Sequence, residues 1–428
     1  MNSFYQYVSA EEAMKLVKNG NRVFVHGSAC TPVYLLQQLA KLSWRFNNLE
    51  LVSITLMGNI EIQKPKYTDQ FHINSLFVSE PVREAVHEGR ADFIPAFLSD
   101  IPDMFRTVLP IDVALVQVSE PDRHGYCTLG VSVDVARTAV DCAKYVIAQV
   151  NPKMPRTHGD AMIHVSKFEA MVLHEEELQQ VHYGDRVTEI EKQIAKNVAK
   201  LIDNGSTLQL GIGTIPDAVL KSLSNHKDLG IHTEMCSDGV VELLEKEVIN
   251  NCKKKIHPHK VVTSFALGTQ KLYDYVNDNP SFAFLDIDYV NNPGVIARNP
   301  KVVAVNSAIE IDLTGQVCAD SIGTYQYSGI GGQMDFMRGA ALSEGGKPII
   351  AMPSRTTKGA PRIVPMLKNG AGVVTTRGHV HYVITEYGSA YLYGKNLRQR
   401  ALLLINISHP DDREWLHKEC FERFKIFV

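Results

Sequence analysis

A glycine-rich segment, Gly211-Ile212-Gly213, has the type and spacing of residues that bind anions. It lies between an alternating apolar run and a stretch of helical spacing that Pro216 opens. Such a loop directs backbone N–H groups from a positive helix end, which suits a phosphate. Glu234 follows roughly 20 positions on, as in a dinucleotide fingerprint, although Pro216 replaces the fingerprint's third glycine. A tight turn that binds nothing is the plain alternative.

Glu234 is the candidate for covalent or acid–base chemistry. We predict it at the end of a strand, and open α/β sheets build their sites at the carboxyl ends of strands. Ser237-Asp238-Gly239 is then expected to turn the chain and to cap a helix through Glu245. This turn would hold Glu234 at the edge of a cleft. The simpler interpretation is that Glu234 is a solvated surface carboxylate without a catalytic role.

Two later segments complete the set of candidates. Ser328-Gly-Ile-Gly-Gly-Gln-Met-Asp-Phe336 has glycines whose amides can approach a ligand and stabilise an oxyanion. Arg355-Thr-Thr-Lys-Gly-Ala-Pro-Arg362 is a basic loop that can pair with nucleotide phosphates. A structural turn and a solvated surface loop are the respective alternatives.

An internal repeat indicates which elements position these residues. Asn19-Gly20 and Asn204-Gly205 each begin the same series: a turn, a short strand, a small-residue loop, and a helix opened by proline. The offset is about 185 residues, and chance similarity between α/β units is the alternative. We therefore expect two similar α/β domains, residues 1–186 and 187–428, joined in the polar stretch of residues 174–186.

Apolar runs predict buried and largely parallel strands that alternate with helices. These strands are expected at residues 113–118, 145–150, 302–306, 348–352 and 382–385. Helices are expected at 187–201 and, opened by Pro410 and docked on the second half, at 409–424. Ser9 is expected to cap a further helix, with Glu11 and Glu12 in its first turn.

Composition narrows the function classes. The chain has 428 residues, 45% hydrophobic and 21% charged, with a formal net charge of −3. Mixed charge of this kind does not match a nucleic-acid partner, and no window has membrane-spanning length. Seven scattered cysteines without paired spacing fit a reducing cytoplasm.

Other catalytic motifs receive no support. The sequence has no Gly-x-Ser-x-Gly elbow, no Walker A sequence and no His-Glu-x-x-His. The pairs His257-Pro-His259 and His379-Val-His381 have no ligand partner at a recognised spacing, so we assign no metal.

Taken together, these segments resemble the acetyl-CoA hydrolase/transferase family, and most closely its 4-hydroxybutyrate CoA-transferases. The resemblance covers nearly the whole chain, and it is carried by the segments 208–220, 230–241, 320–324, 328–336 and 384–388. It implies two similar α/β domains with the active site between them, in agreement with the repeat. It also implies acyl-CoA as a substrate, no permanently bound cofactor, and a homodimer or larger homo-oligomer.

The resemblance also implies roles for individual residues. Glu234 matches the family's nucleophile, and the amides of Gly331 and Gly332 are candidates for oxyanion stabilisation. His26 and Gln209 match positions near the acyl group. The CoA-binding positions are Gly211, Ile212, Gly213, Thr214, Ile215, Ile309, Gly332 and Lys358.

The implied reaction passes CoA between carboxylic acids through a glutamyl-CoA thioester, without ATP. We favour 4-hydroxybutyrate with acetate; butyrate with acetate differs by one hydroxyl, which an apolar site does not strongly reject. An acetyl-CoA hydrolase, in which water resolves the intermediate, and a non-catalytic NAD-binding protein are the other hypotheses.

Overall fold

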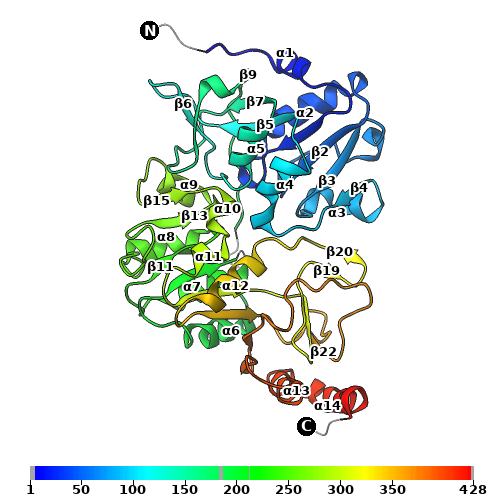
Figure 1. Cartoon of the computed structure of the whole chain (residues 1–428), viewed down its shortest axis with the longest axis vertical. Coiled ribbons are helices and arrows are strands. Elements are labelled where there is room, and N and C mark those ends of the chain that lie inside the picture. Colours follow the sequence, from blue (N-terminus) through cyan, green and yellow to red (C-terminus); the bar gives the residue numbers. More distant parts are fainter. Residues whose placement is uncertain (1–4, 183–186, 212, 426–428) are drawn as a thin grey trace. The chain divides into compact units, whose positions relative to one another are not determined.

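The computed structural model describes residues 5–182, 187–211 and 213–425, and these form two compact units. Unit 1 comprises Met1–Val181, Val262–Val290 and Gln326–Gly331, and unit 2 comprises His182–Val261, Asn291–Tyr325 and Gly332–Val428. Figure 1 traces the elements along the chain. Two segments of the second half of the sequence thus belong to unit 1. Part of the join that we predicted, residues 183–186, lies outside the described residues.

Unit 1 is built on a seven-stranded sheet in which every neighbouring pair is parallel. In spatial order its strands are β4 (Ala91–Phe93), β3 (Phe71–Ser75), β2 (Leu49–Ser53), β1 (Arg22–Val25), β5 (Val113–Val118), β7 (Tyr145–Val150) and β9 (Ala170–Leu173). Its helices are α1 (Ala10–Ala13), α2 (Val33–Lys41), α3 (Glu80–His87), α4 (Ile101–Thr107), α5 (Ala136–Cys142), α9 (Gln270–Val276) and α10 (Ile287–Val290).

Unit 2 is built on a six-stranded sheet that is parallel except for its last pair. Its strands are β11 (Gly230–Ile231), β10 (Thr207–Leu210), β16 (Val302–Asn306), β21 (Lys347–Ala351), β23 (Tyr382–Thr385) and β24 (Gly388–Tyr391). Its helices are α6 (Glu189–Ala199), α7 (Thr214–Lys221), α8 (Asp238–Glu245), α11 (Pro293–Ile296), α12 (Gln333–Leu342), α13 (Leu397–Asn406) and α14 (Pro410–Phe424).

The strand orders confirm the repeat. β1 lies between β2 and β5 in unit 1, and β10 lies in the same way between β11 and β16 in unit 2. β1 is followed by α2 and β10 by α7, as the two matching sequence segments predicted. The expectation of two similar α/β halves with largely parallel sheets is therefore correct.

The predicted elements match the observed ones closely, because strong local signals fix them. Thr188 caps α6 in a reciprocal capping box with Glu191, and Ser9 accepts a hydrogen bond from the Glu12 amide at the start of α1. Helix α14 packs into an apolar cluster of unit 2 through Leu416 and Cys420. No helix of the described residues is long and apolar enough to cross a membrane.

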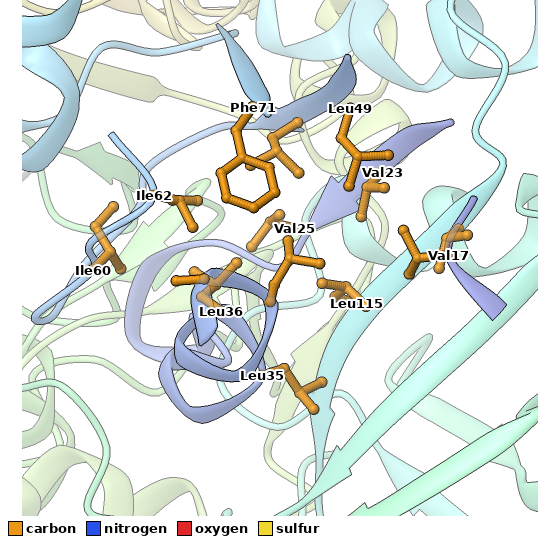
Figure 2. Packing of buried hydrophobic residues seen from close by; sticks show 14 of the residues in the cluster. Val17, Val23, Val25, Leu35, Leu36, Leu49, Ile60, Ile62, Phe71 and Leu115 are labelled. Carbon is orange, nitrogen blue, oxygen red and sulfur yellow. The ribbon is translucent and has the colours of Figure 1, made fainter. Parts of the chain in front are cut away.

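The core of unit 1 lies where α2 packs on the central strands. Figure 2 shows Leu36 of α2 together with Val25 of β1 and Leu115 of β5, and all three are buried in one apolar cluster. Proline at position 32 starts α2, and its apolar three-residue spacing turns Leu36 and Leu39 inward. This packing fixes the loop between β1 and α2.

We expect Leu36→Ala to destabilise unit 1 by about 2–5 kcal/mol, because it leaves a cavity in a closely packed core. The midpoint of urea unfolding measures this change. Lys41→Ala, at an exposed position of the same helix, is the matched control and should leave the midpoint nearly unchanged. An equal loss in both variants would contradict the packing argument.

Candidate active site

Glu234 lies in a loop of unit 2, between two very short strands. β11 ends at Ile231, and β12 (Met235–Cys236) begins directly after Glu234. The prediction that Glu234 ends a strand is therefore wrong by three residues, because the chain leaves the sheet early. The hydroxyl of Thr233 lies 3.2 Å from the Leu210 carbonyl oxygen, which fastens this loop to the carboxyl end of β10.

The helix after Glu234 begins as expected, but Ser237 caps it differently. Ser237 is the N-cap residue of α8, yet its side chain makes no capping bond. Its hydroxyl lies 3.4 Å from a carboxylate oxygen of Asp217 on α7. The turn after Glu234 is thus tied to the helix that follows the glycine loop.

The carboxylate of Glu234 accepts a hydrogen bond from Asn291. The amide nitrogen Nδ2 of Asn291 lies 3.0 Å from Oε2 of Glu234 and 3.1 Å from Oδ2 of Asp335. Asn291 and Asp335 are both buried, and Asp335 lies in the first turn of α12. One side-chain amide therefore serves two carboxylates with its two hydrogens.

Gly332 leaves space for this arrangement. It is the N-cap residue of α12, with φ −95°, so its backbone does not require glycine. A Cβ atom at this position would overlap Oε2 of Glu234 and Nδ2 of Asn291, and would lie 2.8 Å from the Glu234 carboxyl carbon. Close approach to the carboxylate is thus the reason for glycine here.

The surroundings of Glu234 favour its protonated form. Burial is the main cause and raises the pKa of the Glu234 carboxyl to about 7; the negative charge of Asp335 raises it further, and the Asn291 hydrogen bond opposes both. Near neutral pH the group is divided between acid and carboxylate. A carboxylate in this range is more basic than usual, and basicity favours nucleophilic attack.

The glycine loop follows β10 and leads into α7. Gly213 has φ 119°, a conformation that favours glycine, and it is the N-cap residue of α7. The Thr214 hydroxyl donates to Glu191 of α6, which anchors the loop. A Cβ atom on Gly211 or Gly213 would meet nothing within 4 Å, so the loop has open space beside it. Ile212 lies outside the described residues.

Gln209 is fully buried on β10 and pairs with Asn306 at the end of β16. Nδ2 of Asn306 lies 3.0 Å from Oε1 of Gln209, and the reciprocal contact is 3.4 Å. Of the other predicted CoA-binding positions, Ile215 is buried in the first turn of α7, Ile309 is half-buried, and Lys358 is exposed in a turn.

The basic loop is only partly free to bind a ligand. Arg355 forms a bidentate ion pair with Asp412 of α14. Arg362 donates to the Ala308 carbonyl oxygen at 2.9 Å, and burial lowers its pKa. Both arginine side chains are therefore engaged with other parts of the chain, and Lys358 is the basic residue of this loop that faces solvent.

His26 and Gly331 belong to unit 1. His26 is fully buried; its Nε2 lies 2.6 Å from the Ser132 carbonyl oxygen, and its Nδ1 accepts from the Gln117 amide at 3.2 Å. Burial lowers the pKa of His26, so the ring is neutral and Nε2 donates. Gly331 has φ 61°, and its carbonyl oxygen accepts from the Leu98 amide at 3.0 Å.

Asn291 and Asp335 are the two residues of the site that reasoning from the sequence missed. Asp335 lies inside the glycine segment that we singled out, where only the glycines received a role. Asn291 is followed by Asn292 and Pro293, a pair that signals the start of a helix. This local signal gives no indication that the side chain of Asn291 bonds two buried carboxylates.

The pKa of Glu234 predicts how stability changes with pH. Because the folded-state pKa of Glu234 is raised, its carboxyl ionises at lower pH in the unfolded chain than in the folded protein. The free energy of unfolding therefore falls as pH rises from about 4.5 to about 7. We expect Glu234→Gln to remove this loss and to be more stable than the original above pH 7, by at most about 3 kcal/mol. Thermal melting across pH 4–8 measures the difference.

Glu191→Gln is the control with the opposite sign. Hydrogen bonds from Thr214 and Thr188 outweigh burial and lower the pKa of Glu191, so its stabilisation is present at neutral pH and is lost as pH falls. This variant should be less stable than the original at pH 7. A Glu234→Gln difference that stays constant with pH would show that the pKa of Glu234 is not raised in the folded protein.

Family models match both halves of the chain. The model described as "Acetyl-CoA hydrolase/transferase N-terminal domain" matches residues 2–183, and that described as "Acetyl-CoA hydrolase/transferase C-terminal domain" matches residues 268–420.

Curated proteins and a solved structure are similar over almost the full length. A 4-hydroxybutyrate coenzyme A transferase of Clostridium kluyveri is 51% identical, covering 97% of both chains. A succinyl-CoA:acetate/propanoyl-CoA:succinate CoA transferase of Fasciola hepatica is 50% identical, covering 98% of this chain and 88% of that protein. The crystal structure of a 4-hydroxybutyrate CoA-transferase of Porphyromonas gingivalis matches with a TM-score of 0.85 at 40% identity, covering 98% of both chains.

These similarities confirm the expectation of a CoA-transferase enzyme with this fold. With 51% identity over 97% of its length to a curated CoA transferase, and family models that match both of its halves, this chain belongs to the acetyl-CoA hydrolase/transferase family.

Proposed function

We propose that this enzyme moves CoA between a short-chain acyl-CoA and a carboxylic acid through a glutamyl-CoA thioester on Glu234. The observation that carries the proposal is the Glu234 carboxylate itself. It is held by Asn291, lies against the backbone of Gly332, and has a pKa raised to about 7. Such a group is nucleophilic at neutral pH, and an isolated surface carboxylate is much less so.

In the first half-reaction, a carboxylate oxygen of Glu234 attacks the thioester carbonyl carbon. The carbon–sulfur bond breaks, and CoA leaves as the thiolate from a mixed anhydride. The thiolate then attacks the glutamyl carbonyl carbon, the anhydride carbon–oxygen bond breaks, and the original acid leaves as its carboxylate. The enzyme now carries CoA as a thioester.

In the second half-reaction, the incoming carboxylate repeats these steps in reverse order and leaves as the new acyl-CoA. A thioester is exchanged for a thioester, so no ATP is required. Each tetrahedral step places negative charge on an oxygen, and the amides of Gly331 and Gly332 are the proposed donors. Loss of one such donor typically lowers the rate by about 10² to 10³.

The remaining site residues are assigned to the long CoA molecule and to the acyl group. We propose that the segment 211–215, Ile309, Gly332 and Lys358 contact CoA. Loop amides at the start of α7 and the exposed ammonium of Lys358 suit its phosphates. Binding energy from this remote part of the substrate can orient the reacting atoms.

Gln209 and His26 are proposed to lie near the acyl group. The Gln209 amide is held by Asn306, so it presents a fixed pair of polar atoms. Both ring nitrogens of His26 are engaged with backbone groups, so any contact that it makes with substrate is through the ring edge or requires these bonds to change.

4-Hydroxybutyrate with acetate is our favoured pair of acids, with butyrate and acetate as the alternative. The Clostridium kluyveri relative named for 4-hydroxybutyrate is 51% identical, but the Fasciola hepatica relative named for succinate and propanoate compounds is 50% identical. Identity alone therefore does not separate these acids. Competition between labelled 4-hydroxybutyrate, butyrate, succinate and acetate ranks them by kcat/KM.

Two other functions are distinguished by simple assays. A hydrolase releases free thiol from acetyl-CoA faster than it exchanges labelled acetate into acetyl-CoA. An NAD-binding protein changes the fluorescence of NADH at micromolar concentrations. We propose exchange in excess of thiol release and no tight NADH binding.

The wider setting is also proposed. We propose a domain boundary between residues 186 and 187, with Val262–Val290 and Gln326–Gly331 of the second part joining unit 1. We also propose that the enzyme works in the cytoplasm and assembles as a homodimer or larger homo-oligomer. Sedimentation velocity of the full chain measures the assembly state.

Acetyl-CoA without a second acid should leave CoA on Glu234. Borohydride reduction followed by peptide mass spectrometry is expected to show a modified residue 234, because reduction converts the thioester to an alcohol. Glu234→Gln is expected to lose this modification and most of the exchange activity. An unmodified Glu234, together with a fully active Gln variant, contradicts the assignment.

Gly332→Ala should strongly impair catalysis while the protein still folds. The new methyl group overlaps the position of the Glu234 carboxylate, and displacement of a reacting group by about 1 Å can lower the rate about 10²-fold. Gly378→Ala is the matched control in the same unit, because its Cβ would meet nothing closer than 3.8 Å. Acetate exchange by both variants, with thermal melting to verify folding, tests the expectation.

A further inference from the structure

We infer that Asp335 is a positioning residue for Glu234. It orients Glu234 through the Asn291 amide, and its negative charge favours the covalently modified form of Glu234 over the free carboxylate. This inference rests on the proposed function. It assigns a role to a residue that touches neither CoA nor the transferred acyl group in the proposed reaction.

The geometry fixes the orientation of Asn291. Its nitrogen lies between Oε2 of Glu234 and Oδ2 of Asp335, at 3.0 and 3.1 Å. If the amide were turned over, its oxygen would face two carboxylate oxygens and both hydrogen bonds would be lost. The Asp335 acceptor thus keeps the nitrogen of Asn291 directed at Glu234.

Asp335 lies among buried and hydrogen-bonded residues. It lies in the first turn of the ten-residue helix α12, directly before the fully buried Phe336. The ring of Phe336 packs edge-on against His232, two residues before Glu234, with centroids 6.3 Å apart. The neighbouring Gln333 donates to the Ser307 carbonyl oxygen at 2.9 Å. Asp335 is therefore held close to the Glu234 loop.

The charge changes during the reaction give Asp335 a second effect. Glu234 enters the first half-reaction as a carboxylate with one negative charge. When the glutamyl-CoA thioester has formed, that charge has left with the released acid, and Glu234 is neutral. A negative Asp335 on the other side of Asn291 repels the free carboxylate but not the thioester. The repulsion therefore shifts the equilibrium toward the covalent enzyme.

The pKa of Glu234 supports this direction. Among the causes of its rise to about 7, Asp335 from α12 is the charged group, after burial and against the Asn291 hydrogen bond. The other titratable side chains on this segment and the helices beside it are His232, which is buried against Phe336, Cys236, Asp238 at the start of α8, and Asp217 of α7, which bonds Ser237. A charge that disfavours the free carboxylate in titration disfavours it equally relative to the thioester.

The test is Asp335→Asn, which keeps an oxygen acceptor for Asn291 and removes the charge. We expect the acidic limb of the pH profile of kcat/KM to shift from about pH 7 downward by roughly half to one unit. The fraction of enzyme carrying CoA, at fixed ratios of acetyl-CoA to acetate, should fall by a matching factor of about three to ten in its equilibrium constant. Asp335→Ala, which also frees Asn291, should lower kcat further.

Asp312→Asn is the matched control. Asp312 is as deeply buried in the same unit, and it accepts from Thr314 and Gln316 rather than from Asn291. This variant should leave both the pH profile and the labelled fraction unchanged. If Asp335→Asn folds with an unchanged pH profile, or if Asp312→Asn shifts it equally, Asp335 has only a structural role and the inference is overturned.

Failure of the proposed function has a different signature. Without a glutamyl-CoA adduct in the original enzyme, the transfer route through Glu234 is wrong. The coupling of the two carboxylates is still measured without activity, by the melting temperatures of the original, Glu234→Gln, Asp335→Asn and the double variant at pH 5 and pH 8. Additive effects at both pH values would remove the physical basis of the inference.

Discussion

The proposed site depends on one side-chain amide that is shared between two carboxylates. Two buried negative charges close together are unfavourable, and each requires hydrogen bonds to persist in a protein interior. Asn291 supplies one to each, and it is itself fully buried. The glycine at position 332 and the register of α12, which brings Asp335 to the same amide, are conditions for this arrangement.

The duplicated fold shows how the same scaffold serves different purposes. In both units, a central strand leads through a small-residue loop into a helix that begins near a proline. In unit 2 this loop has open space beside its glycines, and the strand before it carries the Gln209 amide. In unit 1 the loop follows His26, whose polar atoms are satisfied by backbone groups. The two copies therefore differ in their polar partners: His26 bonds backbone groups, whereas Gln209 bonds the side chain of Asn306.

Family membership and fold identify a CoA-transferase, and the choice of acid is a separate matter. Two relatives of nearly equal identity carry names with different acids. Small changes in an acyl site alter the ratio of kcat/KM values between two acids, and the overall sequence identity between two enzymes does not reveal such changes. The identity of the acid therefore depends on a few side chains, in contrast to the proposed covalent route, which requires only the carboxylate of Glu234.

The sequence alone predicted the repeat, the parallel strands, the Ser9 cap, the helix near residues 187–201, and Glu234 as the reactive candidate. These rest on local signals such as capping residues and apolar runs, which act within a few residues. The groups that surround Glu234 became visible only in the folded chain. Asn291 and Asp335 lie 57 and 101 positions further along the chain, in the turn between α10 and α11 and in the first turn of α12. No local pattern encodes their meeting, because packing of whole elements on the sheet brings them together.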